Sequence, residues 1–325
     1  MAKDKVCKSH IGGSSFLRNS ASEISLYMPI LDSCLFLTNT TSAPVCNYPQ
    51  NYSFGAPLRI LNTVFDKNET TGTGGCSAIL IHNATITNSI IENCVIANGS
   101  GPNGNNAYQQ YGGALHLLPK YLQGDGLTIR NVRISGMSCG ATQGSAVGVI
   151  FASSVSGSGN LTFENCTFAD NDTSKSAIYF SNKSVGRVVF KNCVFSNGTG
   201  GEKVHGVRGA ESSGKMSDVD LANMTNCLFA SEISYYTFAS EQRILNGEAP
   251  CFRHGSYVPT ADSPLVDAGV NNPGWMTDAY DLQREPDGTL IGKPFRSRIY
   301  NDIVDIGAYE YGVDEASPGF ILLVF

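Results

Sequence analysis

A six-residue pattern recurs seven times in this 325-residue chain and restricts the fold more than any other feature. The pattern reads apolar, any residue, Asn, Cys, any residue, Phe, with substitutions, as in Phe163-Glu-Asn-Cys-Thr-Phe168. Successive copies, counted at the Cys position, lie 29, 31, 38, 34, 27 and 34 residues apart. A constant motif with spacers of variable length is typical of repeats that stack around one core. The copies begin at Leu31, Ile60, Ile91, Ile129, Phe163, Phe190 and Met224.

The spacing of apolar residues within the motif predicts a sharp bend at the Asn. Leu161 and Phe163 share one parity in the sequence, whereas Cys166 and Phe168 share the other. Because alternate residues of a strand face opposite sides, a straight strand would not turn all four inward. The chain therefore bends between the pairs, and Asn tolerates the left-handed backbone of a one-residue corner. The predicted corner residues are Asn62, Asn93, Asn131, Asn165, Asn192 and Asn226.

A glycine-opened segment before each corner supplies a third strand. In Gly112-Gly-Ala-Leu-His-Leu117, Leu115 and Leu117 would face the core, as would Val147 and Val149 in the next segment. Strand, corner, strand and glycine-opened strand together predict an all-β, right-handed parallel β-helix with three strands per coil. We place these repeats in residues 1–250 and a C-terminal β-rich cap in residues 251–325.

The outward residue before each corner Asn gives an independent check of this stacking. From the third copy onward it is Glu92, Arg130, Glu164 and Lys191, so the charge alternates in sign. Side chains on neighbouring strands interact directly, and opposite charges are favourable there. The order of signs supports the predicted register.

Composition excludes some classes of partner. Lys+Arg 22 against Asp+Glu 28 gives a net charge of −6, whereas nucleic-acid binding needs a concentrated basic face. No apolar run is long enough for a transmembrane helix, and the polar first ten residues carry no signal peptide. We expect a monomer. Because Gly12-Gly-Ser-Ser-Phe16 reads as the middle of a coil, we hypothesise that a leader and earlier coils are missing from this sequence.

Two groups of motifs resemble known families. Gly112-Gly-Ala-Leu115 and the Phe-x-x-Asn motifs resemble repeats of polymorphic outer-membrane proteins and related bacterial β-helix surface proteins, which have a pectin lyase-like fold. The Phe-x-x-Asn copies begin at Phe16, Phe36, Phe65 and Phe168.

The C-terminal part is similar to the choice-of-anchor Q domain. The matching segments are Ser263-Pro-Leu-Val-Asp-Ala-Gly269, Thr277-Asp-Ala-Tyr-Asp-Leu282 and Asp305-Ile-Gly-Ala-Tyr-Glu-Tyr311. The resemblance implies a secreted protein or one at the bacterial cell surface, including the outer membrane. We expect the carboxylates of Asp267, Asp278, Asp281 and Asp305 to brace backbone turns.

Five cysteines occupy one inward position of the motif, where Thr63 and Val132 also occur. A slot that accepts Thr or Val suits a free, buried Cys, so we predict a ladder of thiols rather than disulfides or a metal site. The ladder residues are Cys34, Cys94, Cys166, Cys193 and Cys227. The pairing of Cys7, Cys46, Cys76, Cys139 and Cys251 stays open.

The glycine-opened strands also suggest a ligand site. Parity turns His82, His116 and Tyr179 outward, and the predicted register leaves Gly148 as a notch between His116 and Tyr179. A sugar ring would fit such a platform. We expect no cofactor; Asp170 with Asp172 and Asp218 with Asp220 would be the calcium ligands if one were bound, but such pairs commonly form turns.

These observations favour an exported adhesin or glycan-binding protein without catalytic activity, with a polysaccharide or host glycan as its partner. One alternative is a polysaccharide lyase or glycoside hydrolase acting on acidic glycans. Another is a structural stalk that holds a second domain away from the cell.

Overall fold

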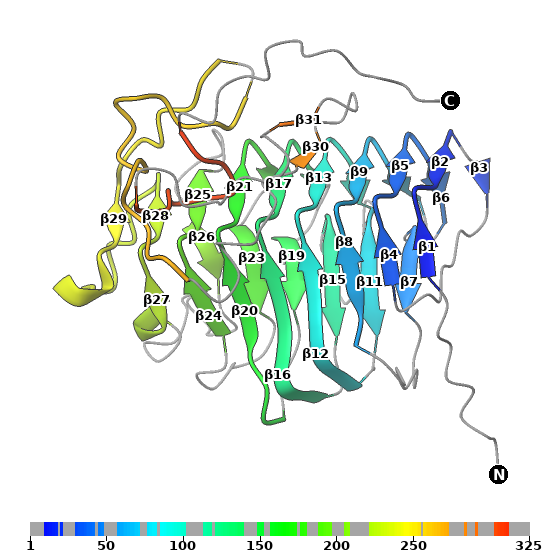
Figure 1. Cartoon of the computed structure of the whole chain (residues 1–325), viewed down its shortest axis with the longest axis horizontal. Helices are drawn as coiled ribbons and strands as arrows, with labels where there is room; N and C mark the ends of the chain where they lie inside the picture. Colours follow the sequence, from blue (N-terminus) through cyan, green and yellow to red (C-terminus); the bar gives the residue numbers. More distant parts are fainter. Residues whose placement is uncertain are drawn as a thin grey trace.

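The computed structural model is all-β and consists mainly of four long parallel sheets (Figure 1). It describes residues 10–18, 20–21, 30–42, 45–48, 57–71, 77–82, 85–101, 113–118, 121–139, 148–152, 157–173, 176–180, 188–196, 205–208, 221–254, 256–272, 283–284, 290–291 and 302–311.

Two sheets flank the predicted Asn corner. Sheet A contains β1 (His10–Gly12), β4 (Ile30–Asp32), β8 (Arg59–Leu61), β12 (Thr85–Glu92), β16 (Tyr121–Arg130), β20 (Leu161–Glu164), β24 (Val188–Lys191) and β27 (Met224–Thr225). Sheet B contains β2 (Ser15–Leu17), β5 (Leu35–Leu37), β9 (Val64–Asp66), β13 (Val95–Ala97), β17 (Arg133–Ser135), β21 (Thr167–Ala169), β25 (Val194–Ser196), β28 (Leu228–Phe229) and β29 (Leu245–Asn246).

Two further parallel sheets complete each turn of the chain. Sheet C contains β3 (Ser20–Ala21), β6 (Thr40–Thr41), β10 (Glu69–Thr70), β14 (Ser100–Gly101), β18 (Ser138–Cys139) and β22 (Asp172–Thr173). Sheet D contains β7 (Cys46–Tyr48), β11 (Ile79–His82), β15 (Leu115–Leu118), β19 (Gly148–Ala152), β23 (Ser176–Phe180) and β26 (His205–Arg208).

The chain visits the sheets in a fixed cycle. From β4 to β23 it runs through sheets A, B, C and D and then returns to sheet A one strand further along. We call one such passage a coil. Figure 1 shows the coils side by side along the long axis, with β1 and β2 at one end and β28 and β29 at the other. Each coil therefore pairs with the coils before and after it.

One hydrophobic core runs through the stacked coils. It contains the inward apolar residues on both sides of the corner, including Phe163 and Phe168. Equivalent rings stack on neighbouring coils, with centroids 4.9 Å apart for Phe163 and Phe190 and 5.2 Å apart for Phe168 and Phe195. The apolar residues before the corner and those after it thus all face inward, which requires the chain to bend between the two strands.

The prediction of three strands per coil is wrong, because sheet C adds a fourth strand to each coil. A second left-handed residue follows sheet B at Arg18, Thr38, Lys67, Asn98, Gly136 and Asp170, with φ between 49° and 61°. The Asn of the Phe-x-x-Asn motif comes next and lies inside: the Asn39 side-chain amide donates to Asn68 Oδ1 (2.8 Å), and that of Asn68 donates to the carbonyl of Phe36 (2.8 Å). The strands of sheet C have only two residues, too few to show an alternating pattern.

The register of β19 also differs from the prediction. Ile150 pairs with Leu115 and Ile178, and Gly148 pairs with Ser176. The segment is therefore displaced by three residues from the predicted alignment, in which Val147 pairs with Leu115. The structure uses the β-branched and aromatic run Val149-Ile150-Phe151 as the strand, in keeping with the preference of such residues for sheets. Val147 itself lies outside the described residues.

Described residues beyond β29 pack against the coils. The 3-10 helix η2 (Ser240–Gln242) precedes β29, and β30 (Gln283–Arg284) pairs with β31 (Leu290–Ile291) in the one antiparallel sheet of the described residues. Few of the described residues beyond 250 lie in strands or bridges, and the others form turns, bends or irregular segments. The β-rich cap stays a prediction, since much of 273–325 lies outside the described residues. Leu265 and Ile306 form a hydrophobic cluster with Val194 and Leu228, which ties residues on both sides of the predicted boundary at 250/251 together.

Candidate functional site

The six predicted corner asparagines share one backbone conformation. Their φ values lie between 48° and 52°. Consecutive side chains are bonded: Asn93 Nδ2 donates to Asn62 Oδ1 (3.2 Å), and Asn131 Nδ2 donates to Asn93 Oδ1 (2.6 Å). We call this row the corner column. It has earlier members at Gly13 and Ser33 and a later one at Arg243, all with positive φ. Sequence reasoning missed Arg243 because no Asn-Cys pair marks that corner.

The five predicted ladder cysteines are buried free thiols. Four of their sulfurs lie within 3.1–3.3 Å of the carbonyl oxygen two residues earlier, and Cys166 lies 3.4 Å from that of Glu164. The hydroxyl of Thr63 donates to the carbonyl of Leu61 in the same way (2.7 Å). This inward position therefore accepts two kinds of side chain. One is a small donor that bonds to the carbonyl on the other side of the corner, and the other is a small apolar group. Among the other cysteines, Cys46 is buried and Cys251 exposed, both free; Cys7, Cys76 and the side chain of Cys139 lie outside the described residues.

Burial sets the chemistry of these thiols. It raises the pKa of Cys94 to about 12 and also raises the pKa of Cys34. Burial is the main cause of a raised pKa at Cys193 too, followed by hydrogen bonding to the thiols of Cys166 and Cys227. Because the thiolate is the reactive form, Cys34, Cys94 and Cys193 are poor nucleophiles.

The predicted charge row is present. Glu92 pairs in register with Arg130, Arg130 with Glu164, and Glu164 with Lys191. Arg130 Nε lies 2.7 Å from Glu92 Oε1. The row continues to Thr225 on β27. Its last three members lie beneath the C-terminal segment and form the wall of the site described below.

The predicted notch at Gly148 is wrong. Phe151, not Gly148, pairs with both His116 and Tyr179, because β19 has the register described above. His116 is only 5% exposed, and its neighbour Leu80 is also buried. The described part of this row is therefore covered and offers no open platform. His82 pairs with Leu118, but the side chains of His82 and Tyr179 lie outside the described residues.

The C-terminal segment binds directly to the last part of the corner column. The side-chain amide of Asn192 donates to the carbonyl of Val270 (3.0 Å) and accepts from its N–H (2.9 Å). Asn226 donates to the carbonyl of Ala268 (2.8 Å), and Asn165 donates to that of Asp305 (3.2 Å). Asn192 also donates to Asn165 Oδ1 (3.2 Å), so it belongs to the column and holds the segment at the same time.

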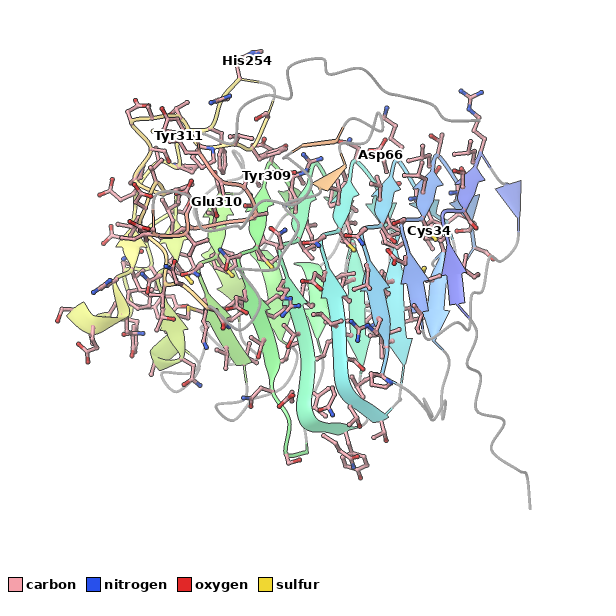
Figure 2. The ribbon with its side chains drawn as sticks, in the orientation of Figure 1. Cys34, Asp66, His254, Tyr309, Glu310 and Tyr311 are labelled. Atoms are coloured by element: carbon pink, nitrogen blue, oxygen red, sulfur yellow. The ribbon has the colours of Figure 1, made fainter. Side chains whose placement is uncertain are left out.

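The motif Asp305–Tyr311 docks on sheet B. The Asp305 carboxylate accepts from the N–H of Asp267 (2.8 Å) and from that of Tyr311, as expected for a carboxylate that braces turns. Gly307 has φ +102°, and an added Cβ would lie 2.8 Å from Thr167 Oγ1, so this glycine permits the close approach. Figure 2 shows Tyr309 and Glu310 above the C-terminal half of the coils.

Buried Arg133 of β17 anchors the same motif. Its Nη1 donates to the hydroxyl of Tyr309 (3.2 Å), and its guanidinium lies 4.9 Å from the ring centroid of Tyr257. Tyr257 donates to Asp170 Oδ2 (3.1 Å). Burial raises the pKa of Tyr257, while Arg133 and a hydrogen bond with Ser135 act in the opposite direction. Asp170 therefore supports the docking of this segment.

The other predicted calcium ligands and two predicted turn-bracing carboxylates lie outside the described residues: the side chain of Asp172, and Asp218, Asp220, Asp278 and Asp281.

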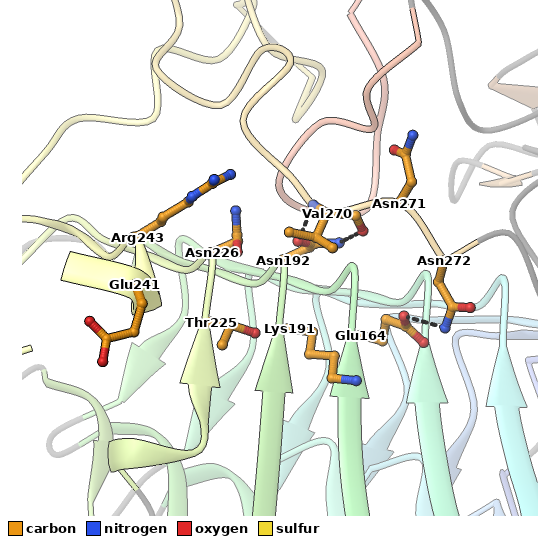
Figure 3. A pocket seen from close by; sticks show the side chains of 10 residues that line it. All are labelled: Glu164, Lys191, Asn192, Thr225, Asn226, Glu241, Arg243, Val270, Asn271 and Asn272. Carbon is orange, nitrogen blue, oxygen red and sulfur yellow. Dashed lines mark hydrogen bonds between the residues drawn. The ribbon is translucent and has the colours of Figure 1, made fainter. Parts of the chain in front are cut away.

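An open hollow of about 540 Å³ lies where residues 270–272 cross the corner column. Sheet A supplies its wall, η2 and the residue after it supply one end, and the C-terminal segment supplies the opposite side (Figure 3). Its lining residues are Glu164, Lys191, Asn192, Thr225, Asn226, Glu241, Arg243, Val270, Asn271 and Asn272. Polar and charged groups dominate this set, and we take the hollow as the candidate functional site.

Sequence reasoning found parts of this site without bringing them together. Asn192 and Asn226 were predicted as corners and Glu164 and Lys191 as surface charges. Glu241, Arg243 and residues 270–272 were missed, because the fold of the C-terminal segment, and not a local motif, places them there. The Asp-Ala-Gly269 motif marks the point where that segment reaches the column.

Two familiar kinds of feature are absent from the described residues. Within the described ranges, no group of three or more His, Cys, Asp or Glu residues is arranged to hold a metal ion. The same part of the chain contains no helix with the length and apolar character needed to cross a membrane. No family model, curated protein or solved structure matches this chain.

Proposed function

We propose that this chain is an exported, non-catalytic glycan-binding protein of the adhesin type, at the cell surface or secreted. Its frame would be a right-handed parallel β-helix closed by a choice-of-anchor Q-like segment. The cycle through sheets A to D supports the β-helix, since parallel strands joined by a crossover are right-handed in the great majority of cases. The docking of Asp305–Tyr311 on sheet B supports a structural role for the segment.

The hollow beside Asn192 carries the proposal of glycan binding. It is open to solvent along one side and lined by amide, hydroxyl and charged groups on rigid strands and corners. Sugars present hydroxyl groups that both donate and accept hydrogen bonds beside apolar C–H faces, and a lining of polar side chains with their apolar stems offers partners for both. Its walls come from hydrogen-bonded coils, so a ligand would not have to order them.

A glycan array with the full chain tests the proposal. Thr225→Trp would place a large ring in the hollow and is expected to abolish binding. Thr128→Trp is the matched control, because Thr128 lies in sheet A on β16, three strands away from β27. Binding that survives Thr225→Trp would exclude the hollow as the site. An absence of glycan binding would favour the stalk, and release of new reducing ends or unsaturated uronates would favour the enzyme.

A further inference from the structure

The four side-chain amides that line the hollow already have partners in the chain. Asn192 is the most fully engaged, because both of its N–H donors and its oxygen have partners, among them Asn165 Oδ1 (3.2 Å). Their partners are the N–H and carbonyl of Val270 for Asn192, the carbonyl of Ala268 for Asn226, the carbonyl of Asp302 and N–H of Val304 for Asn271, and the carboxylate of Glu164 for Asn272.

Unlike these amides, the two cationic side chains of the hollow are not engaged by the described residues. Lys191 and Arg243 are exposed, and neither side chain has a hydrogen bond or ion pair with any residue that the structure describes. Glu164 is buried and accepts a hydrogen bond from the amide of Asn272 (3.0 Å), which holds this carboxylate against the C-terminal segment. Figure 3 shows the carboxylate of Glu241 and the guanidinium of Arg243 directed to opposite sides. The exposed charged groups of the hollow are therefore two cations, Lys191 and Arg243, and one carboxylate, that of Glu241, which is directed away from Arg243.

The backbone fixes the spacing of the two cations. Lys191 ends β24 beside corner Asn192, and Arg243 is itself the corner two positions further along the column. Two strand spacings separate these positions by about 10 Å at the backbone. Thr225 of β27 lies between them in the row. At this backbone spacing, a chain with repeated anionic groups can place one group at each cation.

We propose that the hollow binds an acidic polysaccharide, with Lys191 and Arg243 each contacting a carboxylate or sulfate group. This inference rests on the proposed function and names its class of ligand. Arg243 offers two parallel N–H donors to an anionic group, and Lys191 supplies a compact charge. The hydroxyl of Thr225, between the two cations, would form a hydrogen bond with a hydroxyl group of the sugar.

The test measures affinities of the full chain for polygalacturonate, a sulfated polysaccharide and neutral dextran. Lys191→Gln and Arg243→Asn each remove one charge, and Asn is the residue that the corner column otherwise uses. Each substitution is expected to weaken binding of the acidic polymer by about tenfold or more. Arg18→Asn is the matched control, since Arg18 is also an exposed arginine with positive φ but lies in the first coil. It should leave the affinity unchanged.

The outcomes separate this inference from the proposed function. Binding of dextran as tightly as the acidic polymers, unaffected by either substitution, would overturn the acidic ligand and leave glycan binding in place. An absence of binding to all three polymers and on the array would overturn both. A preference between the carboxylated and sulfated polymers identifies the anion. Lys191→Gln lies on an exposed strand end, so it tests the inference even if Arg243→Asn fails to fold.

Discussion

The side-chain amide of Asn192 exchanges two hydrogen bonds with the backbone of Val270, one at 3.0 Å to the carbonyl and one at 2.9 Å from the N–H. This is the pattern with which a strand residue meets its partner, made here by a side chain. Asn192 therefore has two roles, because its left-handed φ of 51° also forms the corner of its coil. The residues that bend the chain are the same ones that hold its C-terminal segment.

Replacing Asn192 separates these roles. Asn192→Gly keeps the freedom to adopt positive φ but removes the amide, whereas Asn192→Ala loses both. We expect both to loosen the segment and Asn192→Ala to destabilise the fold further, by about 1 kcal/mol. Limited proteolysis measures release of the segment, and urea unfolding measures stability. Equal protease resistance in wild type and Asn192→Gly would contradict the docking role.

Gly307→Ala should weaken the docking of Asp305–Tyr311. The new Cβ would meet Thr167 Oγ1 at 2.8 Å and Val194 Cγ2 at 3.0 Å, in addition to the strain at φ +102°. Gly13→Ala is the control, because Gly13 has φ +61° with nothing within 4 Å of the new atom. We expect a loss of about 3 kcal/mol for Gly307→Ala and about 1 kcal/mol for Gly13→Ala. Similar losses would show that strain, not contact, dominates.

Arg133→Met should destabilise the C-terminal segment more than Tyr309→Phe does. The first change removes the contact with Tyr257 and the hydrogen bond to Tyr309, whereas the second removes only a hydroxyl. We expect about 2–3 kcal/mol against about 1 kcal/mol in chemical unfolding. If Arg133→Met were neutral, the buried cation would not hold the segment.

The raised pKa of Cys94 predicts a loss of stability in alkali. The thiol stays protonated in the folded chain up to about pH 12, whereas a thiol in the unfolded chain ionises near pH 9. Between these values the folded chain binds more protons, so the free energy of unfolding falls as pH rises, by at most about 1.4 kcal/mol per pH unit for this group. Cys94→Thr keeps a donor in the slot and should flatten the decline. An unchanged slope would mean that Cys94 is not its source.

The corner column was predictable because its physical cause is local. Parity within Leu161–Phe168 requires a bend, and Asn165 supplies the left-handed conformation. The second corner was harder to predict from residue type. Asn98, Gly136 and Asp170 suit positive φ, but Arg18, Thr38 and Lys67, which occupy the same corner in other coils, do not. Its signal was the buried Asn one residue later, which the Phe-x-x-Asn motif already contained.

Longer-range features required the structure. The alignment of β19 depends on which of two overlapping segments pairs with Leu115, and a glycine-based alignment chose the wrong one. The hollow depends on residues 270–272 returning to coils formed some eighty residues earlier, as the bond from Asn192 to Val270 shows. Local patterns do not encode such a return.

Nearest-neighbour pairing has a consequence for how this molecule changes in evolution. Strands of sheets A to D pair only with strands of adjoining coils. The coils on either side of a unit such as residues 63–93 therefore have edges that could also pair with each other. Its duplication or deletion would lengthen or shorten the rod by one strand spacing. The hollow at the far end would keep its walls, so the length of the stack and the shape of the hollow can change independently.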